Sequence, residues 1–405
     1  MPHRAEPSPK TSSGRPAVAG GNPAFQQPIL VTRPVAPNPE RYAEISAEIF
    51  ASQWMTNDGP TTRRLEQQLQ EHLEVAFCAT FSSGTAALLI ALRGLDLSGE
   101  VITTPFTFPA TPHCIEWNGL KPVFCDIDPH TYNLDVEQIS ARITPQTSAI
   151  VPVHVFGNPC DVIGIQEIAD RHGLKVIYDA AHAFGVRAMG RPIGVWGDLS
   201  IFSFHATKIF HTVEGGAIVA NSRDHLESLT LLRNFGIVNE NEVRGIGLNG
   251  KLSELHAAVG LLVLTEIDRE IDSRARLTRH YRERLQEIEG IRFQKSADGA
   301  RGNYFSLALE FSESEFGLSR DQVCEGLRAE NIFARKRFYP LCSENDCYSH
   351  LPSACSEGLP NARRLSENIL TLPLYGALTI NQVDGVIDAL LRLRSNAASV
   401  RQALA

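Results

Sequence analysis

The sequence predicts an α/β protein with a large, mostly parallel sheet that carries helices on both faces, followed by a smaller α+β domain. Between residues 75 and 178, short and continuously apolar runs alternate with segments of helical spacing. Apolar strands that alternate with helices are typical of a parallel sheet covered on both sides. From about residue 291 this alternation gives way to a mixed pattern of strands and helices.

The composition is that of an ordinary globular protein. The 405 residues are 43% hydrophobic and 21% charged, and the chain is long enough for two domains. The net charge of -8 argues against a nucleic-acid partner, because neutralising phosphates needs a basic surface. No apolar run approaches the ~20 residues that cross a bilayer, and no signal peptide is recognisable at the start. We therefore expect a cytoplasmic protein that binds neither nucleic acid nor membranes.

The cysteines give no sign of a metal site. None of the eight forms a C-x-x-C pair, and no group of His and Cys has the spacing of a zinc site. Several lie inside apolar runs, as Cys125 does in P-V-F-C-D. We interpret them as small buried hydrophobic residues and predict no metal.

The chain divides into three parts. Residues 1–28 are rich in Pro, Ser, Gly and Ala without periodicity, and a disordered extension is expected there. The large domain is expected over 29–265, and a connector helix with the small C-terminal domain over 266–405.

Apolar periodicity predicts the elements of both domains. In the large domain it predicts helices at 39–52, 61–73, 86–92, 107–117, 134–143, 162–172 and 222–234. It predicts strands there at 75–81, 101–104, 122–125, 149–156, 175–178, 199–204 and 217–220. One long or broken helix at 254–288 connects to the small domain, where a strand is expected at 304–311 and helices at 319–331, 365–369 and 382–393.

A small-residue turn, Ser82-Ser83-Gly84-Thr85, stands between the first of these strands and a helix. Free backbone N–H groups and the helix dipole at such a turn favour an anion. A plain N-cap made by Ser82 or Ser83 explains the same residues. In parallel sheets ligands bind beyond the carboxyl ends of the strands, which is where this turn lies.

Two charged residues follow other strands of the same sheet. Among the seven lysines of the chain, only Lys208 is flanked by small and hydroxyl residues between two core strands. Partial desolvation lowers the pKa of such an amine and makes it nucleophilic, although an ordinary loop lysine fits the pattern as well. Asp179 ends the apolar run V-I-Y-D and needs a partner, as a cap, a salt bridge or a ligand contact. His182, three residues later, is more often structural than catalytic in such a place.

Together these features predict one cofactor. Pyridoxal 5′-phosphate needs a lysine for its aldehyde, a carboxylate for its pyridine nitrogen, N–H groups for its phosphate and an aromatic ring for its face. Lys208, Asp179, the turn at Gly84 and the aromatic residue Phe108 all follow strands of one sheet. Each feature alone is weak evidence for the cofactor, and their coincidence at one edge of the sheet is much stronger evidence.

Six motifs of the sequence resemble those of a known protein family. They are W-M-T-N-D-G-P (54–60), S-S-G-T-A-A-L (82–88), T-T-P-F-T-F-P-A-T (103–111), D-A-A-H-A-F-G (179–185), F-S-F-H-A-T-K (202–208) and E-G-G-A-I-V (214–219). From about Ile29 to the C-terminus the chain resembles the sugar aminotransferases of the DegT/DnrJ/EryC1/StrS group. The resemblance implies the type I aspartate-aminotransferase fold and a pyridoxal-phosphate enzyme.

The resemblance also implies roles for individual residues. Lys208 is expected to form the Schiff base, Asp179 to contact the pyridine nitrogen and Phe108 to stack on the ring. The backbone of Gly84 and Thr85 and the hydroxyl of Ser203 are expected to hold the phosphate, and His182 to lie near the 3-hydroxyl. Asn249, in G-L-N-G-K, matches an asparagine that reaches the phosphate from the neighbouring subunit, which implies a homodimer with shared active sites.

Within the group the chain looks most like the members that make dTDP-4-amino-4,6-dideoxyglucose. That likeness rests on four motifs, D-A-A-H (179–182), H-A-T-K (205–208), T-V-E-G-G (212–216) and F-G-N-P-C-D (156–161). It implies dTDP-4-keto-6-deoxy-D-glucose as acceptor and L-glutamate as donor. A 3-keto-sugar aminotransferase and a non-catalytic relative that binds the cofactor for regulation remain alternatives. A 3-dehydratase of this fold carries histidine in place of the lysine, so the presence of Lys208 disfavours it.

Substrate contacts are predicted in two segments. Thr56 and Asn57 lie in the turn W-M-T-N-D-G-P. Arg335, Arg337 and Tyr339 lie in the basic and aromatic run I-F-A-R-K-R-F-Y. Guanidinium groups suit a diphosphate or a carboxylate, although a solvated loop explains this run equally well.

Overall fold

The larger part of the molecule is built on a seven-stranded sheet. The computed structural model describes residues 14–405; the predicted extension falls partly on residues 1–13, which lie outside the described residues. The strand order is β1 (Phe77–Phe81), β9 (Gly216–Ala220), β8 (Leu199–Ser203), β5 (Lys175–Asp179), β4 (Thr147–Val151), β2 (Glu100–Thr103), β3 (Lys121–Phe124). From β8 to β3 neighbouring strands are parallel, whereas β9 runs antiparallel to both β1 and β8. The predicted α/β fold with a mostly parallel sheet is confirmed.

Both faces of this sheet are buried, which explains the continuously apolar strands. Val176 and Tyr178 of β5 pack with α2 (Pro60–Leu73), α6 (Val162–His172) and α8 (Glu254–Leu264) on one face. Ile177, between them, packs on the other face with α3 (Gly84–Gly94), α4 (Ala110–Trp117) and α7 (Arg223–Arg233). Successive side chains of a strand point to opposite faces, so a strand buried on both sides must be apolar throughout.

Helix ends follow capping residues. Asn38 caps α1 (Pro39–Ser52), and Asp161 caps α6, which ends at Gly173 in the left-handed region (φ 67°). Both helices have the bounds that the apolar spacing predicted, and each follows its capping residue directly. The strand expected at 149–156 is shorter: β4 ends at Val151, and a 3-10 turn follows at Val155–Gly157. The helix expected at 134–143 is also shorter, as α5 (Val136–Ile139) with a 3-10 turn.

The smaller part is a four-stranded antiparallel sheet packed against helices. Its order is β12 (Ile291–Phe293), β13 (Leu307–Phe311), β15 (Ile369–Leu372), β14 (Arg335–Lys336). The helices are α10 (Glu313–Phe316), α11 (Arg320–Ala329), α12 (Pro360–Asn368), α13 (Ile380–Ser395) and α14 (Ala397–Leu404). Helix α14 was not predicted from the sequence. Ile369 was predicted to be helical, whereas this residue begins β15.

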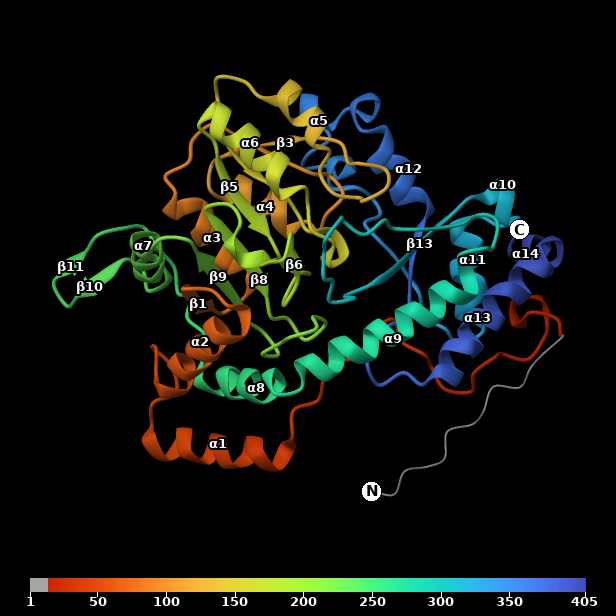
Figure 1. The fold of residues 1–405 in the computed structure, drawn as a ribbon, viewed down its shortest axis with the longest axis horizontal. Coiled ribbons are helices and arrows are strands. Elements are labelled where there is room, and N and C mark those ends of the chain that lie inside the picture. The colour runs from red at the N-terminus through yellow and green to blue at the C-terminus, as the bar shows by residue number, and fades with distance from the viewer. Residues whose placement is uncertain (1–13) are drawn as a thin grey trace.

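The predicted connector is a broken helix. α8 ends at Leu264, and α9 (Ile267–Leu285) begins two residues beyond Thr265. Figure 1 shows α8 lying along the large sheet and α9 running from it toward the small domain. The exact division between the two domains stays a prediction.

The expectation of disorder is wrong for residues 14–28. The backbone N–H groups of Ala17 and Ala24 donate to the carboxylate of Glu330 (2.9 and 2.8 Å), which is fully buried. The ring of Phe25 packs over Gly385, and Ile29 pairs with Ile332. The segment therefore docks on the small domain. It has no apolar periodicity of its own, and hydrogen bonds to the buried carboxylate of Glu330 hold it instead.

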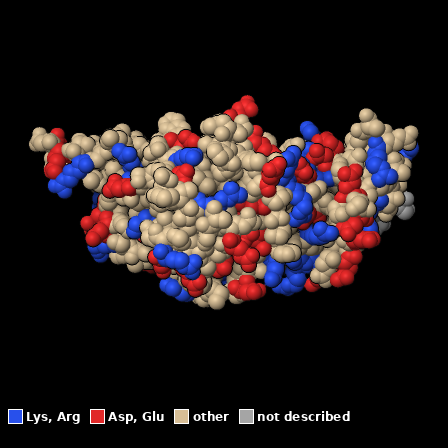
Figure 2. Space-filling view, turned by 90° about the horizontal axis from the view of Figure 1, so that it is seen from above, with Lys and Arg blue, Asp and Glu red and all other residues tan. Residues whose placement is uncertain are grey.

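On the face drawn in Figure 2, basic and acidic side chains are intermixed, without a large area of one sign. Within residues 14–405, no helix is long and apolar enough to cross a membrane.

Candidate active site

A cavity of about 330 Å³ lies at the carboxyl ends of the large sheet, between that sheet and the segment at β14. Most of the predicted site residues line it: Gly84, Thr85, Phe108, Asp179, His182, Ser203, Lys208, Arg335 and Arg337. Four other predicted residues, Thr56, Asn57, Asn249 and Tyr339, are not part of the lining.

The turn before α3 forms an anion cradle as well as a helix cap. The Ser83 hydroxyl oxygen accepts a hydrogen bond from the N–H of Ala86 (3.0 Å), so the N-cap interpretation is correct. The N–H groups of Gly84 and Thr85 have no acceptor in the described part of the chain. A Cβ atom on Gly84 would lie 2.8 Å from Cβ of Ser203, so only glycine leaves this approach open. The cradle therefore fits a phosphate group.

Asp179 is held rigidly at the end of β5. One carboxylate oxygen accepts from the Thr111 hydroxyl (2.8 Å) and the other from the N–H of Ala181 (3.0 Å). Burial raises the pKa of Asp179, while these two hydrogen bonds and the nearby charge of Lys208 oppose that shift. A carboxylate oriented in this way, at a cavity wall and without a salt bridge in the described residues, suits a protonated ring nitrogen.

His182 contributes a neutral imidazole. Its ring stacks on Phe305, with 4.2 Å between the ring centroids. Burial, and then the positive charges of Lys208 and Arg337, hold the pKa of His182 well below its usual value. Its Nδ1 atom is buried without a hydrogen-bond partner, and His182 lines the cavity, so the ring is suited to a ligand hydroxyl.

Lys208 sits in a tight turn between β8 and β9. Its N–H donates to the carbonyl of His205 (2.8 Å), and the N–H of Ala206 donates to the carbonyl of Val213 (2.7 Å). Burial lowers the pKa of Lys208 to about 8; Asp179 raises it, and Arg337 and Arg335 lower it. Its Nζ atom lies 5.2 Å from the centroid of the Phe305 ring. The amine therefore carries a larger neutral fraction near pH 7 to 8 than an ordinary lysine does.

Two guanidinium groups face the same cavity from the small domain. No ion pair to Arg335 or Arg337 exists among the described residues, and Nε of Arg337 is buried without a partner. Burial, and then the charge of Arg335, lowers the pKa of Arg337 to about 10. Unpaired arginines at a cavity wall favour an anionic ligand.

The predicted residues outside the lining have other surroundings. Tyr339 is half exposed, and the guanidinium of Arg320 lies over its ring at 4.8 Å. Thr56, Asn57 and Asn249 are exposed, and Asn249 pairs with Asn234.

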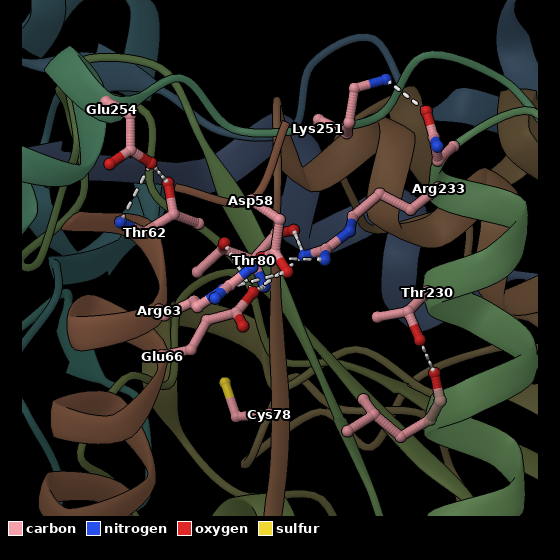
Figure 3. A network of polar contacts seen from close by, with 12 residues as sticks. Asp58, Thr62, Arg63, Glu66, Cys78, Thr80, Thr230, Arg233, Lys251 and Glu254 are labelled. Carbon is pink, nitrogen blue, oxygen red and sulfur yellow. Dashed lines mark hydrogen bonds and ion pairs between the residues drawn. The ribbon is translucent and has the colours of Figure 1, made fainter. Parts of the chain in front are cut away.

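The segments that carry these exposed residues are fixed by a buried polar network (Figure 3). Arg233 donates to the carboxylate of Glu66 (2.8 Å) and to the carbonyl of Thr80 (2.7 Å), and its other nitrogen lies 3.5 Å from Asp58. Glu254 accepts from the N–H groups of Thr61 (2.7 Å) and Thr62 (3.1 Å) at the start of α2. The turn at residues 54–60 is thereby held in place beside α8.

Sequence reasoning missed residues that complete the site. Thr111 orients Asp179, and Thr107 bonds Thr111 (3.0 Å); their i, i+4 spacing in T-F-P-A-T is a signal that could have found them. Phe305 and Phe338 reach the site from the small domain, and no local pattern marks them. His205 and Glu214 also line the cavity, with 3.6 Å between Nε2 and Oε1.

Comparison with known proteins decides the class. Residues 39–391 match the DegT/DnrJ/EryC1/StrS aminotransferase family. The chain belongs to this family. It is an aminotransferase, and its fold is that of the solved members. It is 42% identical over 370 residues to the dTDP-4-amino-4,6-dideoxy-D-glucose transaminase of Shigella dysenteriae, covering 91% of this chain and 100% of the relative.

Two solved structures extend the comparison. DesI, solved in the presence of its TDP-sugar product, superposes with a TM-score of 0.89 at 38% identity, covering 96% of this aminotransferase and 97% of DesI. NtdA from Bacillus subtilis, solved with bound cofactor PMP, has a TM-score of 0.81 at 25% identity, covering 88% of this chain and 82% of NtdA. One of these relatives was thus solved with a TDP-sugar product and the other with the cofactor PMP.

Proposed function

We propose that this aminotransferase binds pyridoxal 5′-phosphate and transfers the amino group of L-glutamate to C4 of dTDP-4-keto-6-deoxy-D-glucose, giving dTDP-4-amino-4,6-dideoxy-D-glucose. One juxtaposition carries the proposal: a desolvated lysine, a hydrogen-bonded aspartate and a free helix N-terminus line one cavity. The likeness to the Shigella dysenteriae transaminase and to DesI supports the sugar substrate.

The residues present fit the cofactor. The N–H groups of Gly84 and Thr85 and the hydroxyl of Ser203 would hold its phosphate, and Asp179 would pair with its ring nitrogen. The unpartnered Nδ1 of His182 fits its hydroxyl, and Phe108, which is 59% exposed at the cavity, offers a ring for stacking. When bound, the cofactor supplies an electron-accepting ring that stabilises a carbanion at the donor's α-carbon.

Lys208 moves the proton. Its pKa of about 8 places Nζ close to the working pH, where an amine serves as base in one step and, once protonated, as acid in the next. Burial sets this pKa, and the guanidinium groups of Arg337 and Arg335 lower it further. The turn between β8 and β9 limits the movement of the side chain, so that the proton is delivered within one confined region.

Arg335 and Arg337 bind the anionic groups of the substrates. Both face the cavity, and neither is paired with a carboxylate within residues 14–405. A guanidinium donates two parallel hydrogen bonds to a carboxylate or a phosphate, which suits both L-glutamate and the nucleotide diphosphate. The two substrates bind in turn, so one pair of arginines serves both.

The same proposal includes a homodimer. Asn249 is exposed and lies outside its own subunit's cavity lining, which is the placement expected of a residue that serves a partner's site. The hairpin of β10 (Ile237–Asn239) and β11 (Glu242–Val243) stands away from the body of the molecule in Figure 1. Exposed apolar side chains gather there and in the turn at 54–60: Trp54, Met55, Phe235, Ile237, Val238, Val243 and Ile246. Light scattering at micromolar concentration is expected to give twice the chain mass.

The function is tested by product analysis. Purified enzyme is incubated with dTDP-4-keto-6-deoxy-D-glucose and ¹⁵N-labelled L-glutamate, and the sugar is examined by mass spectrometry and NMR. We expect ¹⁵N bonded to C4 of the sugar. Nitrogen at C3 would identify a 3-aminotransferase, and release of 2-oxoglutarate without sugar amination would reject this acceptor. No reaction of glutamate at all would favour a non-catalytic relative.

A further inference from the structure

A second cavity lies behind the active site, between α9 and the segment that leads into β13. Its volume is about 140 Å³. Hydroxyl, amide and guanidinium groups line it, including those of Thr278, Arg282, Gln294, Tyr304 and Ser306. No acidic side chain is part of the lining. The cavity therefore offers hydrogen-bond donors and a positive charge, without a carboxylate to balance them.

Arg282 is the positive charge in this lining. Two other arginines of α9 have carboxylate partners, since Arg274 bonds Glu270 (2.6 Å) and Arg284 bonds Asp384 (2.6 Å). Arg282 is partly buried and has no ion pair among the described residues; one nitrogen donates to the carbonyl of Gln294 (3.1 Å). Its guanidinium also lies over the ring of Phe293, 4.7 Å from the centroid, a contact that leaves the in-plane N–H donors available. A guanidinium carries five N–H donors, and among the described residues only one hydrogen bond uses them.

Thr278, one helical turn before Arg282, supplies a second unsatisfied group. Its side chain lines the cavity, its residue is 8% exposed, and its hydroxyl oxygen is buried without a hydrogen-bond partner. A helical threonine normally bonds the carbonyl four residues earlier, and this one does not. Buried hydroxyl groups are rarely left unpaired in native proteins, so this one points to a ligand that completes it.

The cavity shares its wall with the active site. Phe156 lines the second cavity and stacks on Phe338, a lining residue of the first (5.6 Å between centroids). Phe305 lies between the lining residues Tyr304 and Ser306, stacks on His182 and lies beneath Nζ of Lys208. Whatever fixes residues 304–306 also fixes the ring against which His182 and Lys208 are placed.

We propose that this second cavity is a regulatory site for a small tetrahedral oxyanion such as inorganic phosphate, bound by Arg282 and Thr278. The volume of about 140 Å³ equals roughly four to five waters at ~30 Å³ each, and lies below the ~300 Å³ at which pockets for larger organic ligands begin. A nucleotide sugar is too large for it. The bound anion orders residues 304–306 and thereby the aromatic wall of the active site. This inference goes beyond the proposed function and does not depend on the identity of the sugar.

The test is direct binding of inorganic phosphate to the cofactor-loaded enzyme. Excess dTDP is present throughout, so that the substrate site is filled, and calorimetry measures the affinity. We expect saturable binding in the wild type. R282Q is expected to weaken it by about tenfold or more, as the loss of a charge-assisted hydrogen bond does. R279Q is the matched control: Arg279 lies on the same helix, is exposed and has no ion pair in the described chain, so phosphate affinity should be unchanged.

A second variant keeps the test decisive if R282Q folds poorly. T278V is expected to lower phosphate affinity a few-fold without lowering Tm, because the hydroxyl that it removes has no partner in the part of the chain that the structure describes. Hydrogen exchange of residues 302–308 should slow with phosphate in the wild type and not in R282Q. No saturable binding, binding that R282Q leaves intact, or binding lost in R337Q would each overturn the proposal. Tighter binding of acetate than of sulfate would overturn the tetrahedral class.

Discussion

The two halves of the active site are built in different ways. The large-sheet half is a row of short turns, each fixed by its own strand: Gly84 after β1, Asp179 at the end of β5 and Lys208 after β8. The small-domain half consists of side chains brought in from far along the chain, namely Phe305, Arg335, Arg337 and Phe338. The first half is specified locally, and the second depends on how the two domains pack.

The chemistry divides along the same line. The large-sheet half holds groups whose protonation matters, and the small-domain half holds cations and rings that adjust those groups and bind anions. Damage to the first half should therefore affect turnover, whereas damage to the second should affect substrate binding and the pKa of Lys208. Substitutions in each half test this division.

K208A should abolish proton transfer. General acid–base groups contribute about 10²–10⁴-fold, and Lys208 serves as both base and acid, so a loss of at least about 10³ in kcat is expected. Stopped-flow spectroscopy of the half-reaction with L-glutamate measures it. K175A, in an exposed ion pair with Asp198, is the control and should react normally. Near-normal half-reaction rates in K208A would show that Lys208 is not the group that transfers the proton.

D179N should lower kcat by about 10²–10³, as the loss of one preorganised electrostatic contact does. The amide keeps the size of the side chain, so folding and Tm should change little. T111V removes only the hydroxyl that orients Asp179, and an about tenfold loss of kcat is expected. Steady-state kinetics at saturating substrates compares the three proteins. Equal losses in D179N and T111V would show that orientation, not charge, is what matters.

R337Q should mainly raise KM. Because this guanidinium has no ion pair within residues 14–405, its loss removes binding to the substrate anion, and a 10–100-fold rise in KM for the nucleotide sugar is expected. R328Q is the matched control, since Arg328 is exposed on α11. A fall in kcat without a change in KM would place Arg337 with the catalytic half instead.

The pKa of Lys208 should move in opposite directions in two variants. Arg337 lowers the pKa of Lys208 and Asp179 raises it, so R337Q should shift it upward from about 8 and D179N downward. The neutral amine reacts with acylating reagents, so reactivity should rise with pH through this pKa. Labelling of Lys208 in cofactor-free protein, followed by mass spectrometry across pH 6–10, measures the shift. Shifts of the same sign in both variants would contradict the electrostatic account.

The sequence predicted the locally built half well. Ser83, Asp179 and Lys208 were found because each follows an apolar strand that is buried on both faces, and the apolar spacing at 39–52 and 162–172 predicted helices α1 and α6. In such places the side chain that matters and the element that positions it are neighbours in the chain. Thr111 was within reach for the same reason, since it stands in the first turn of α4, four residues after Thr107 in the motif T-F-P-A-T.

The small-domain half of the active site could not be predicted from the sequence, for physical reasons. The place of Phe305 depends on the antiparallel register of β13 with β15, and that of Arg337 on β14 pairing with the same strand. Residues 14–28 looked disordered because their order comes from Glu330, more than three hundred residues away. The substrate roles assigned to Thr56, Asn57 and Tyr339 rest on short motifs, and these residues lie outside the cavity lining.

In the proposed function, Lys208 and the groups around it carry out amino transfer from glutamate. The most direct measurement adds L-glutamate to the purified, cofactor-loaded enzyme without sugar, and follows the visible spectrum together with release of 2-oxoglutarate. The account predicts that the visible band is lost as one equivalent of 2-oxoglutarate appears per chain, and that borohydride treatment before glutamate leaves the cofactor on the peptide containing Lys208. An unchanged spectrum without 2-oxoglutarate, or trapping on another lysine, would contradict it.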